Sequence, residues 1–599
     1  MEKISILGFI LAILYFITEL ACNGHTHVDN NVQSKQKALI DFNSGLKDPN
    51  NRLSSWKGSN YCYWKGISCE NSTGFVISID LHNPYPRENV YENWSSMNLS
   101  GEISPSLIKL KSLKYLDLSF NSFKAMPVPQ FFGSLKNLIY LNLSSAGFSG
   151  SIPSNLRNLS SLQYLDLSSE YLDDIDFEYL YDIHSEYFNN LFVENIEWMT
   201  DLVSLKYLGM NYVNLSLVGS RWVEVANKLP SLTELHLGGC SLSSSFPSPT
   251  FVNLTSLAVI AINSNYFNSK FPEWLLNVSN LVSIDISDNQ LHGRIPLGLG
   301  ELPNLQYLDL SLNVNLRGSI SQLLRKSWKK IEVLNLAQNE LHGSIPSSIG
   351  NFCNLKYLDL SFNLLNGSLP EIIEGLETCS SKSPLPNLTE LSLYYNQLMG
   401  KLPNWLGELK NLRALYLSSN KFEGPIPTSL WTLQHLEYLY LSRNELNGSL
   451  PDSIGQLSQL QGLGVSSNHM SGSLPYSIGQ LSQLQCLYVS SNHLSGSLPD
   501  SIGQLSQLQD LDVSSNHLSG SLPDSIGQLS QLQELDVSSN HLSGSLSEQH
   551  FWKLSKLWYL RMDSNSFHLN VSPNWVPPFQ VNDLDMGSCR LGPSFPAWL

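Results

Sequence analysis

The stretch Ser490–Gln509, SSNHLSGSLPDSIGQLSQLQ, occurs again without change at Ser514–Gln533, and the copy before it at Ser466–Gln485 differs at two positions. Corresponding residues are 24 apart. A fixed period of this length is typical of a repeat protein, in which each unit stacks on the next. The wider pattern, L-x-x-L-x-L-x-x-N-x-L-x-G-x-I/L-P, runs from about Val76 to the end of the chain in roughly twenty units.

The spacing of the leucines predicts the fold. In L-x-x-L-x-L the alternate apolar side chains point inward from a short strand and the intervening residues point outward. The Asn of each unit, such as Asn468, can both donate and accept, which suits a ladder that satisfies buried backbone groups. Cys240 and Cys589 stand in the same place and are expected to be buried, unpaired thiols. The pattern predicts an α/β-type repeat solenoid, a leucine-rich-repeat superhelix with short parallel strands on its concave face.

Composition and motifs argue against several functions. The formal net charge of −16 argues against a nucleic-acid partner. No H-E-x-x-H, paired CxxC, P-loop or kinase signature is present, so we expect no enzyme, no cofactor and no metal site. The Asp residues of the LDLS segments recur at the period and are expected at surface positions of the scaffold. They are Asp117, Asp166, Asp309 and Asp359.

The first residues of the chain suggest export, and its last residues suggest truncation. A basic Lys3 followed by 14 apolar residues predicts a signal peptide over residues 1–22, too short to anchor the chain in a bilayer. Residues 23–75 are expected to form an N-terminal cap and residues 76–599 the repeats. Insertions interrupt the period near 82–97, 169–204 and 377–386. Because the last residues lie inside a repeat, we expect a truncated ectodomain or a truncated gene product, secreted if the chain ends at Leu599.

Cysteines and sequons fit an oxidising compartment. Cys62 and Cys69 precede the first repeat and are expected to close the cap with a disulfide. Cys353 and Cys379 lie in corresponding loops of successive units, where stacking would bring them close enough to bridge. Cys486 is expected to stay free. Twelve Asn-x-Ser/Thr sites permit glycosylation: Asn71, Asn93, Asn98, Asn142, Asn158, Asn214, Asn253, Asn277, Asn366, Asn387, Asn447 and Asn570.

Outward strand positions are the candidates for ligand contact, because the core and turns are constrained by stacking whereas these positions are free to differ. Tyr and Arg, the usual anchors of protein interfaces, gather on neighbouring units. The predicted contact patch comprises Tyr394, Tyr395, Arg413, Tyr416, Tyr438, Tyr440, Arg443 and Tyr488. The alternative is an exposed surface with no partner at these residues.

Four histidines repeat at the period and should stack along one edge: His469, His493, His517 and His541. One interpretation is a solvated turn residue copied with its repeat. The other is a pH-sensitive or metal-binding ladder.

The 24-residue NxLxGxIP repeat resembles plant extracellular leucine-rich-repeat receptors. So does the cap ALIDFNSGLKDPNNRLSSW…CYWKGISC, although this chain has Tyr61 where many relatives have the first Cys of a pair. The segments GEISPSLIKLKSLKYLDLSFNSF, VENIEWMTDLVSLKYLGMNYVNLS and NKLPSLTELHLGGCSLS are similar to the receptor-like proteins typified by the fungal xylanase receptors.

The resemblance implies the ligand-binding ectodomain of a plant cell-surface receptor in defence. Such a protein binds a peptide, protein or microbial pattern and signals through a partner kinase. It also implies passage through the secretory pathway, with membrane attachment only where a C-terminal helix follows. The alternatives are a secreted inhibitor of microbial cell-wall-degrading enzymes and the ectodomain of a receptor kinase.

Overall fold

The computed structural model describes residues 30–84, 97–124, 126–169, 191–243, 245–246, 252–326, 328–375 and 378–592. The predicted signal peptide, Asn93 and much of the predicted insertions near 82–97 and 169–204 lie outside the described residues. So do residues 376–377, at the start of the third insertion. The chain divides into two compact units, Met1–Gln290 and Leu291–Leu599.

The first unit begins with a cap built around α2 (Asn30–Gly45), whose Leu39 and Phe42 are fully buried. A disulfide joins Cys62 to Cys69, with Cα atoms 5.5 Å apart, and confirms the predicted closure of the cap. Other cap elements are η1 (Tyr61–Tyr63) and β1 (Leu46–Lys47), which pairs antiparallel with β4 (Ser100–Gly101).

Short strands of the first unit form a ladder, and after the first two strands the middle residue of each strand is buried. β2 pairs antiparallel with β3, and the later strands are parallel. The ladder comprises β2 (Ile67–Cys69), β3 (Val76–Asp80), β5 (Tyr115–Asp117), β6 (Tyr140–Asn142), β8 (Tyr164–Asp166), β10 (Tyr207–Gly209), β11 (Glu234–His236), β12 (Val259–Ala261) and β13 (Ser283–Asp285). The remaining strands of this unit are β7 (Gly150–Ser151) and β9 (Leu191–Phe192).

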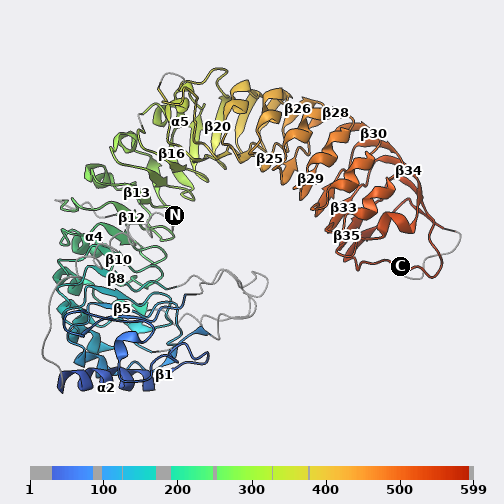
Figure 1. Ribbon diagram of the computed structural model, residues 1–599. Helices are drawn as coiled ribbons and strands as arrows, with labels where there is room; N and C mark the ends of the chain where they lie inside the picture. The colour runs from blue at the N-terminus through green and yellow to red at the C-terminus, as the bar shows by residue number, and fades with distance from the viewer. Residues whose placement is uncertain are drawn as a thin grey trace. The chain divides into compact units, whose positions relative to one another are not determined.

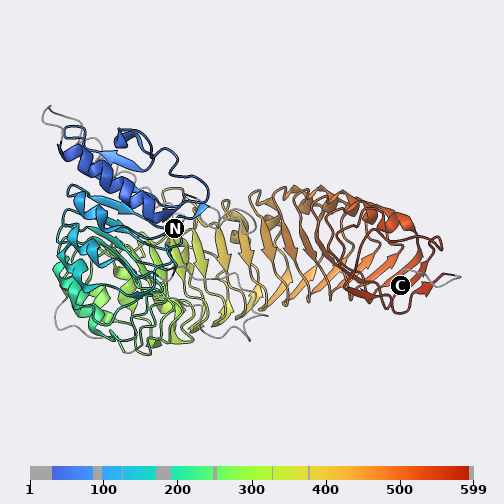
Figure 2. The same cartoon turned by 90° about the horizontal axis from the view of Figure 1, so that it is seen from below.

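The second unit continues the same construction with strands that lie side by side and parallel (Figure 2). Its ladder comprises β15 (Tyr307–Asp309), β17 (Val333–Asn335), β19 (Tyr357–Asp359), β21 (Glu390–Ser392), β23 (Ala414–Tyr416), β25 (Tyr438–Tyr440), β27 (Gly462–Gly464), β29 (Cys486–Tyr488), β31 (Asp510–Asp512), β33 (Glu534–Asp536), β35 (Tyr559–Arg561) and β37 (Asp583–Asp585). Within this unit the ladder lies on the inner side of the curve, so the predicted strand face is present (Figure 1).

A second row of parallel strands lies on the outer side of this unit, after the turn that ends each ladder strand (Figure 1). It comprises β14 (His292–Arg294), β16 (Asn315–Ser319), β18 (Glu340–Gly343), β20 (Leu364–Ser368), β22 (Gln397–Lys401), β24 (Lys421–Pro425), β26 (Glu445–Gly448), β28 (His469–Gly472), β30 (His493–Gly496), β32 (His517–Gly520), β34 (His541–Leu546), β36 (Ser566–Leu569) and β38 (Arg590–Leu591).

Short helices precede the ladder strand of the next repeat in most repeats. Most start after the Pro of the repeat, which fixes an extended residue ahead of one 3₁₀ turn. The 3₁₀ helices are η2 (Pro105–Lys109), η3 (Gln130–Ser134), η4 (Ser154–Asn158), η6 (Glu197–Asp201), η7 (Glu273–Asn277), η8 (Leu297–Glu301), η9 (Ser347–Asn351), η10 (Asn404–Glu408), η11 (Thr428–Thr432), η12 (Asp452–Gln456), η13 (Tyr476–Gln480), η14 (Asp500–Gln504), η15 (Asp524–Gln528) and η16 (Glu548–Phe551). The short α-helices are α4 (Arg221–Ala226) and α5 (Ile320–Leu323).

A buried asparagine ladder holds successive repeats together. Asn492 donates from Nδ2 to the carbonyls of Val465 at 2.9 Å and Val489 at 3.1 Å, and its Oδ1 accepts from the Met470 amide at 2.9 Å. Cys240 occupies the same place, buried and free, with its thiol 3.0 Å from the Met210 carbonyl. The asparagine side chain therefore satisfies buried backbone groups, as the repeat pattern predicts, and joins each unit to the one before it.

The prediction that the LDLS aspartates are surface positions is wrong for three of them. Asp117, Asp166 and Asp309 are each more than 90% buried. The Oδ1 atom of Asp117 accepts from the amide and the hydroxyl of Ser119, at 2.9 and 2.6 Å. The carboxylate thus closes the turn after its own strand, and the hydrogen bonds offset its burial. Among the described residues, no helix is both long enough and apolar enough to span a bilayer.

Candidate functional site

The parallel register of the second unit aligns the outward side chains of neighbouring strands. Ser392 of β21 pairs with Tyr416 of β23, Tyr416 with Tyr440 of β25, and Tyr440 with Gly464 of β27. The same edge of four successive strands therefore presents a serine, two tyrosines and a glycine. These four strands are direct neighbours in the sheet, so their outward side chains form one continuous surface.

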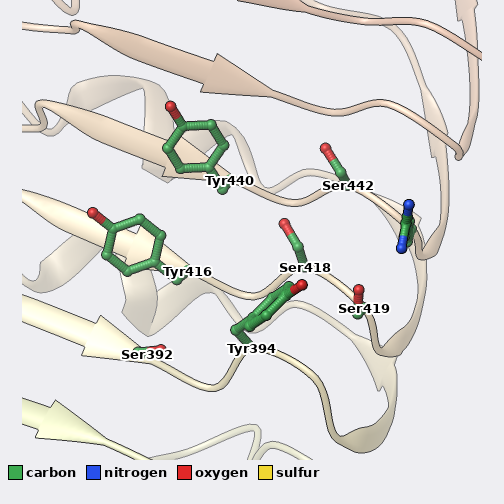
Figure 3. A pocket seen from close by; sticks show the side chains of 8 residues that line it. Ser392, Tyr394, Tyr416, Ser418, Ser419, Tyr440 and Ser442 are labelled. Atoms are coloured by element: carbon green, nitrogen blue, oxygen red, sulfur yellow. The ribbon is translucent and has the colours of Figure 1, made fainter. Parts of the chain in front are cut away.

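Tyr416 and Tyr440 form the centre of this surface. Their ring centroids are 5.8 Å apart and their planes differ by 9°. The two rings and the turns that follow their strands enclose an open groove of about 380 Å³ (Figure 3). The residues that line it, here called the tyrosine groove, are Ser392, Tyr394, Tyr416, Ser418, Ser419, Tyr440, Ser442 and Arg443.

Two glycines make room for the tyrosine rings. A Cβ built on Gly464 would stand 2.6 Å from Cδ1 of Tyr440, and one on Gly462 would stand 3.0 Å from Cδ1 of Tyr438. Both glycines are buried, although their positions face outward along the strand. Outward strand positions are expected to be exposed, and in this repeat that expectation is wrong, since the tyrosines of the preceding strand cover both glycines.

The polar groups of the groove are partly unsatisfied. The Ser419 hydroxyl is buried and has no hydrogen-bond partner among the described residues. Arg443 is exposed at the end of the groove, and in the described part of the chain no carboxylate lies within ion-pair distance of it. Burial raises the pKa of Tyr416, and burial with the nearby Cys486 raises the pKa of Tyr440 to about 12. Both phenols are therefore neutral donors at physiological pH.

The structure brings four residues of the predicted contact patch together in the groove: Tyr394, Tyr416, Tyr440 and Arg443. The other four lie outside it. Tyr438 donates its hydroxyl to Gln461 at 2.9 Å, Tyr488 donates to Asp510 at 2.9 Å, and Arg413 pairs with Glu437 at 3.1 Å.

Tyr395 turns away from the groove and stacks on Phe362, with ring centroids 5.0 Å apart. Tyr395 has φ of 53°, and Ser419 and Arg443 have similar φ values at the same place in the next two repeats, so its backbone does not distinguish it from these groove residues. Phe362 also contacts Tyr394, edge to face at 5.0 Å. The three rings form one aromatic cluster, of which only Tyr394 lines the groove.

The sequence patterns do not single out the serines of the groove. Ser418, Ser419 and Ser442 occupy places where serine recurs in many repeats, and Ser392 stands where many other ladder strands end in Asp or Tyr. Only the neighbouring tyrosines distinguish them, because Tyr394 stands where the following repeat has Ser418. A search for repeats with an aromatic residue at that place would have found the groove.

The predicted sequons fall mainly outside the strand ladder. Asn366 and Asn447 are exposed on β20 and β26 of the outer row, and Asn158 and Asn277 end 3₁₀ helices. Asn71, Asn214, Asn387 and Asn570 are also exposed, and Asn253 is half-buried. Among the described sequons only Asn142 lies on a ladder strand, so glycans at the exposed sites would leave the strand face open.

Two sequons are buried. Asn142 donates to Asp117 and to the Tyr140 hydroxyl, each at 3.3 Å, and Asn98 accepts from Asn83 at 2.8 Å. A glycan on either side chain is incompatible with this packing, so we expect both sites to be unoccupied in the folded protein.

A second disulfide lies in the same unit as the groove. It joins Cys353 to Cys379, whose Cα atoms are 5.4 Å apart. The bond connects the loop after η9 to the segment that leads into β21. It therefore ties the repeat that precedes the groove to the strand that carries Ser392.

The fold and this strand-face groove define a leucine-rich-repeat protein, and the chain belongs to that family. The family model described as leucine-rich repeat region matches residues 96–325 and 404–599. The leucine rich repeat N-terminal domain matches residues 34–70, and single leucine rich repeats match residues 330–352, 354–376 and 387–409.

Within that family the chain is similar to plant receptor-like proteins. It is 37% identical over 277 residues to receptor-like protein EIX1 of Solanum lycopersicum, which covers 45% of this chain and 25% of that one. It is 37% identical over 255 residues to receptor-like protein EIX2 of the same plant, covering 41% and 22%. The matched region spans about a quarter of the length of these relatives.

The fold is also similar to that of a solved plant receptor kinase. The structure of the Arabidopsis receptor kinase HAESA in complex with the peptide hormone IDA and the co-receptor SERK1 matches with a TM-score of 0.66 and 29% identity. The match covers 90% of this chain and 91% of that one.

Proposed function

We propose that this chain is the ligand-binding ectodomain of a plant cell-surface receptor-like protein, and that an extended peptide segment of its ligand binds in the tyrosine groove. The observation that carries the proposal is the groove itself, in which two stacked tyrosines adjoin an unpaired Arg443 and an unsatisfied Ser419 hydroxyl. Aromatic rings give contact area at low entropic cost, and Tyr and Arg dominate binding energy in protein interfaces.

The chemistry of the groove suggests the ligand segment. An apolar or aromatic side chain would lie between the edges of Tyr394 and Tyr416, and a carboxylate would pair with Arg443. Ser419 would then gain a backbone partner from the ligand, which removes the cost of its buried, unpaired hydroxyl. An acidic or C-terminal peptide segment meets these requirements better than a neutral glycan, which lacks the charge for Arg443.

The charges on the strand face beyond the groove favour one orientation of the bound peptide. Outward positions of β31 and β33 are acidic, with Asp510, Asp512, Glu534 and Asp536. A basic residue or amino terminus of the peptide would be attracted to these strands, whereas its carboxylate is attracted to Arg443. The peptide would therefore run with its acidic end at β25 and its basic end toward β33.

Signalling belongs to the same proposal. The crystallised relative is a receptor kinase in complex with a peptide hormone and a co-receptor. For this chain we propose defence signalling at the extracellular side of the plasma membrane through a partner kinase, with a peptide or protein as ligand and with no enzymatic activity of its own.

A selection experiment tests the proposal. A library of random peptides displayed on phage is panned on the purified chain and, in parallel, on the Tyr416→Ala/Tyr440→Ala variant. Tyr476→Ala is the control, because Tyr476 is 66% exposed on η13 and lies outside the groove. We expect peptides enriched on the wild type and on the control but not on the double variant. Enrichment of the same peptides on all three proteins would contradict the proposal.

A further inference from the structure

The histidine ladder of the second unit is a regular array of imidazoles. The ring centroids of His469, His493, His517 and His541 follow one another at 5.8, 5.7 and 5.9 Å, with planes that differ by 15°, 6° and 9°. All four side chains are exposed, at the starts of β28, β30, β32 and β34. The array is therefore accessible from solvent along its whole length.

The backbone beneath the ladder is held rigidly. Each histidine follows a buried asparagine of the asparagine ladder, and Ser471 and Ser495 pair with His493 and His517 in the parallel register of the outer row. The spacing of the rings is consequently set by the repeat and not by the imidazoles themselves. Two neighbouring side chains can turn about their own torsions while their Cα atoms stay in place.

The ring nitrogens of the ladder are available. In the described part of the chain, no hydrogen bond or ion pair engages any of the four imidazoles. Three other histidines differ: His82 lies against Asp80, His236 against Glu234 at 3.3 Å, and His550 against Asp524 at 3.2 Å. An unpaired neutral imidazole is the commonest protein ligand for transition metals.

We propose that adjacent histidines of this ladder bind divalent transition-metal ions, two imidazoles to each ion. Two nitrogens on a tetrahedral Zn²⁺ stand about 3.3 Å apart, given a Zn–N bond of about 2.0 Å. Rings whose centroids are 5.7–5.9 Å apart reach that separation when they turn edge to edge, because their nitrogens lie on the ring periphery. Water completes the coordination at this open surface.

Four imidazoles in a row hold at most two ions by this arrangement. Each ion joins the start of one outer strand to the start of the next, so metal binding cross-links successive repeats. Binding only to the folded chain raises its stability. Imidazole ligands also predict an order of affinity, with Cu²⁺ above Zn²⁺ and no binding of Mg²⁺.

Calorimetric titration of the chain with ZnCl₂, with MgCl₂ as the ion control, tests this inference. The His493→Gln/His517→Gln variant interrupts every adjacent pair, and we expect its Zn²⁺ affinity to fall at least about tenfold. The His469→Gln/His541→Gln variant keeps the central pair and should bind a single ion. His435→Gln, which removes an exposed histidine outside the ladder, should bind as the wild type does.

Thermal unfolding gives a second readout. Zn²⁺ should raise the unfolding temperature of the wild type and of His435→Gln but not of His493→Gln/His517→Gln, and a chelator should reverse the rise. All substituted side chains are exposed, so circular dichroism should show folded variants. Equal Zn²⁺ affinity in the wild type and the interrupted ladder, or no Zn²⁺ binding to the wild type, would overturn the inference.

Discussion

The ring of Tyr440 lies directly against Gly464 of the next strand, where a Cβ would stand 2.6 Å from its Cδ1 atom. The contact holds the ring in place beside Tyr416 and leaves no room for a side chain at residue 464. Gly464 does not line the groove, but its lack of a side chain allows the Tyr440 ring to take its place there.

Gly464→Tyr should displace the Tyr440 ring into the groove. We expect a loss of stability of about 1–3 kcal/mol from overpacking, together with loss of peptide binding. Asp585→Tyr is the matched control, since it places the same side chain at the same strand position on β37, outside the groove and outside the acidic strands β31 and β33. Unfolding by urea and binding of a selected peptide are measured on both. Wild-type affinity in Gly464→Tyr would show that the position of the Tyr440 ring is unimportant.

Asn492→Ala should destabilise the repeats by on the order of 3 kcal/mol, because the Met470 amide and the Val465 carbonyl lose their partner inside the core. Asn492→Cys should cost less. A thiol in the corresponding place, Cys240, donates to the Met210 carbonyl at 3.0 Å. Urea midpoints of the two variants are compared, and equal midpoints would contradict the role of the amide ladder.

The disulfide between Cys353 and Cys379 closes a sequence separation of 26 residues. Replacing both residues by Ser should cost about 3 kcal/mol, since the unfolded chain regains the freedom that the cross-link removes. Cys486→Ser is the control, because Cys486 is free. The urea midpoint should fall for the double variant alone. An unchanged midpoint would mean that the bond adds nothing to stability.

Cys486 should react slowly with alkylating reagents. Burial and the hydrogen bond to Asp510 raise the pKa of its thiol from 9.0 to about 11. Because the thiolate is the reactive form, alkylation at pH 8 should be about a hundredfold slower than for a thiol of pKa 9. Asp510→Asn should lower the pKa and increase the rate, and Asp536→Asn serves as a control on the next strand. Rates that are equal in Asp510→Asn and the wild type would contradict this cause.

Much of the fold could be predicted from the period alone. A leucine at every second position of a short strand must point inward, so the strand ladder and the burial of residues such as Leu463 and Leu487 follow directly. The cap disulfide followed from two cysteines placed just ahead of an open leucine core. These features depend on backbone stacking, which the repeat determines.

The candidate site was harder to predict because it depends on how individual side chains are oriented and packed. Gly464 lies at an outward position, yet the Tyr440 ring buries it. Tyr395 is adjacent to Tyr394 in sequence, yet it stacks on Phe362 outside the groove. Asp117 recurs at the period as a surface residue would, yet the turn after its strand encloses it. The spacing of residues in the repeat does not determine any of these three side-chain arrangements.

The affinity of a peptide selected on the wild-type chain, measured by calorimetry on Tyr416→Ala/Tyr440→Ala and on Tyr476→Ala, tests the central claim most directly. Removal of two groove tyrosines should weaken binding at least about 30-fold while the unfolding temperature stays near that of the wild type. The Tyr476→Ala control should bind as the wild type does. Equal affinity in all three folded proteins would place the ligand elsewhere and contradict the assignment of the tyrosine groove.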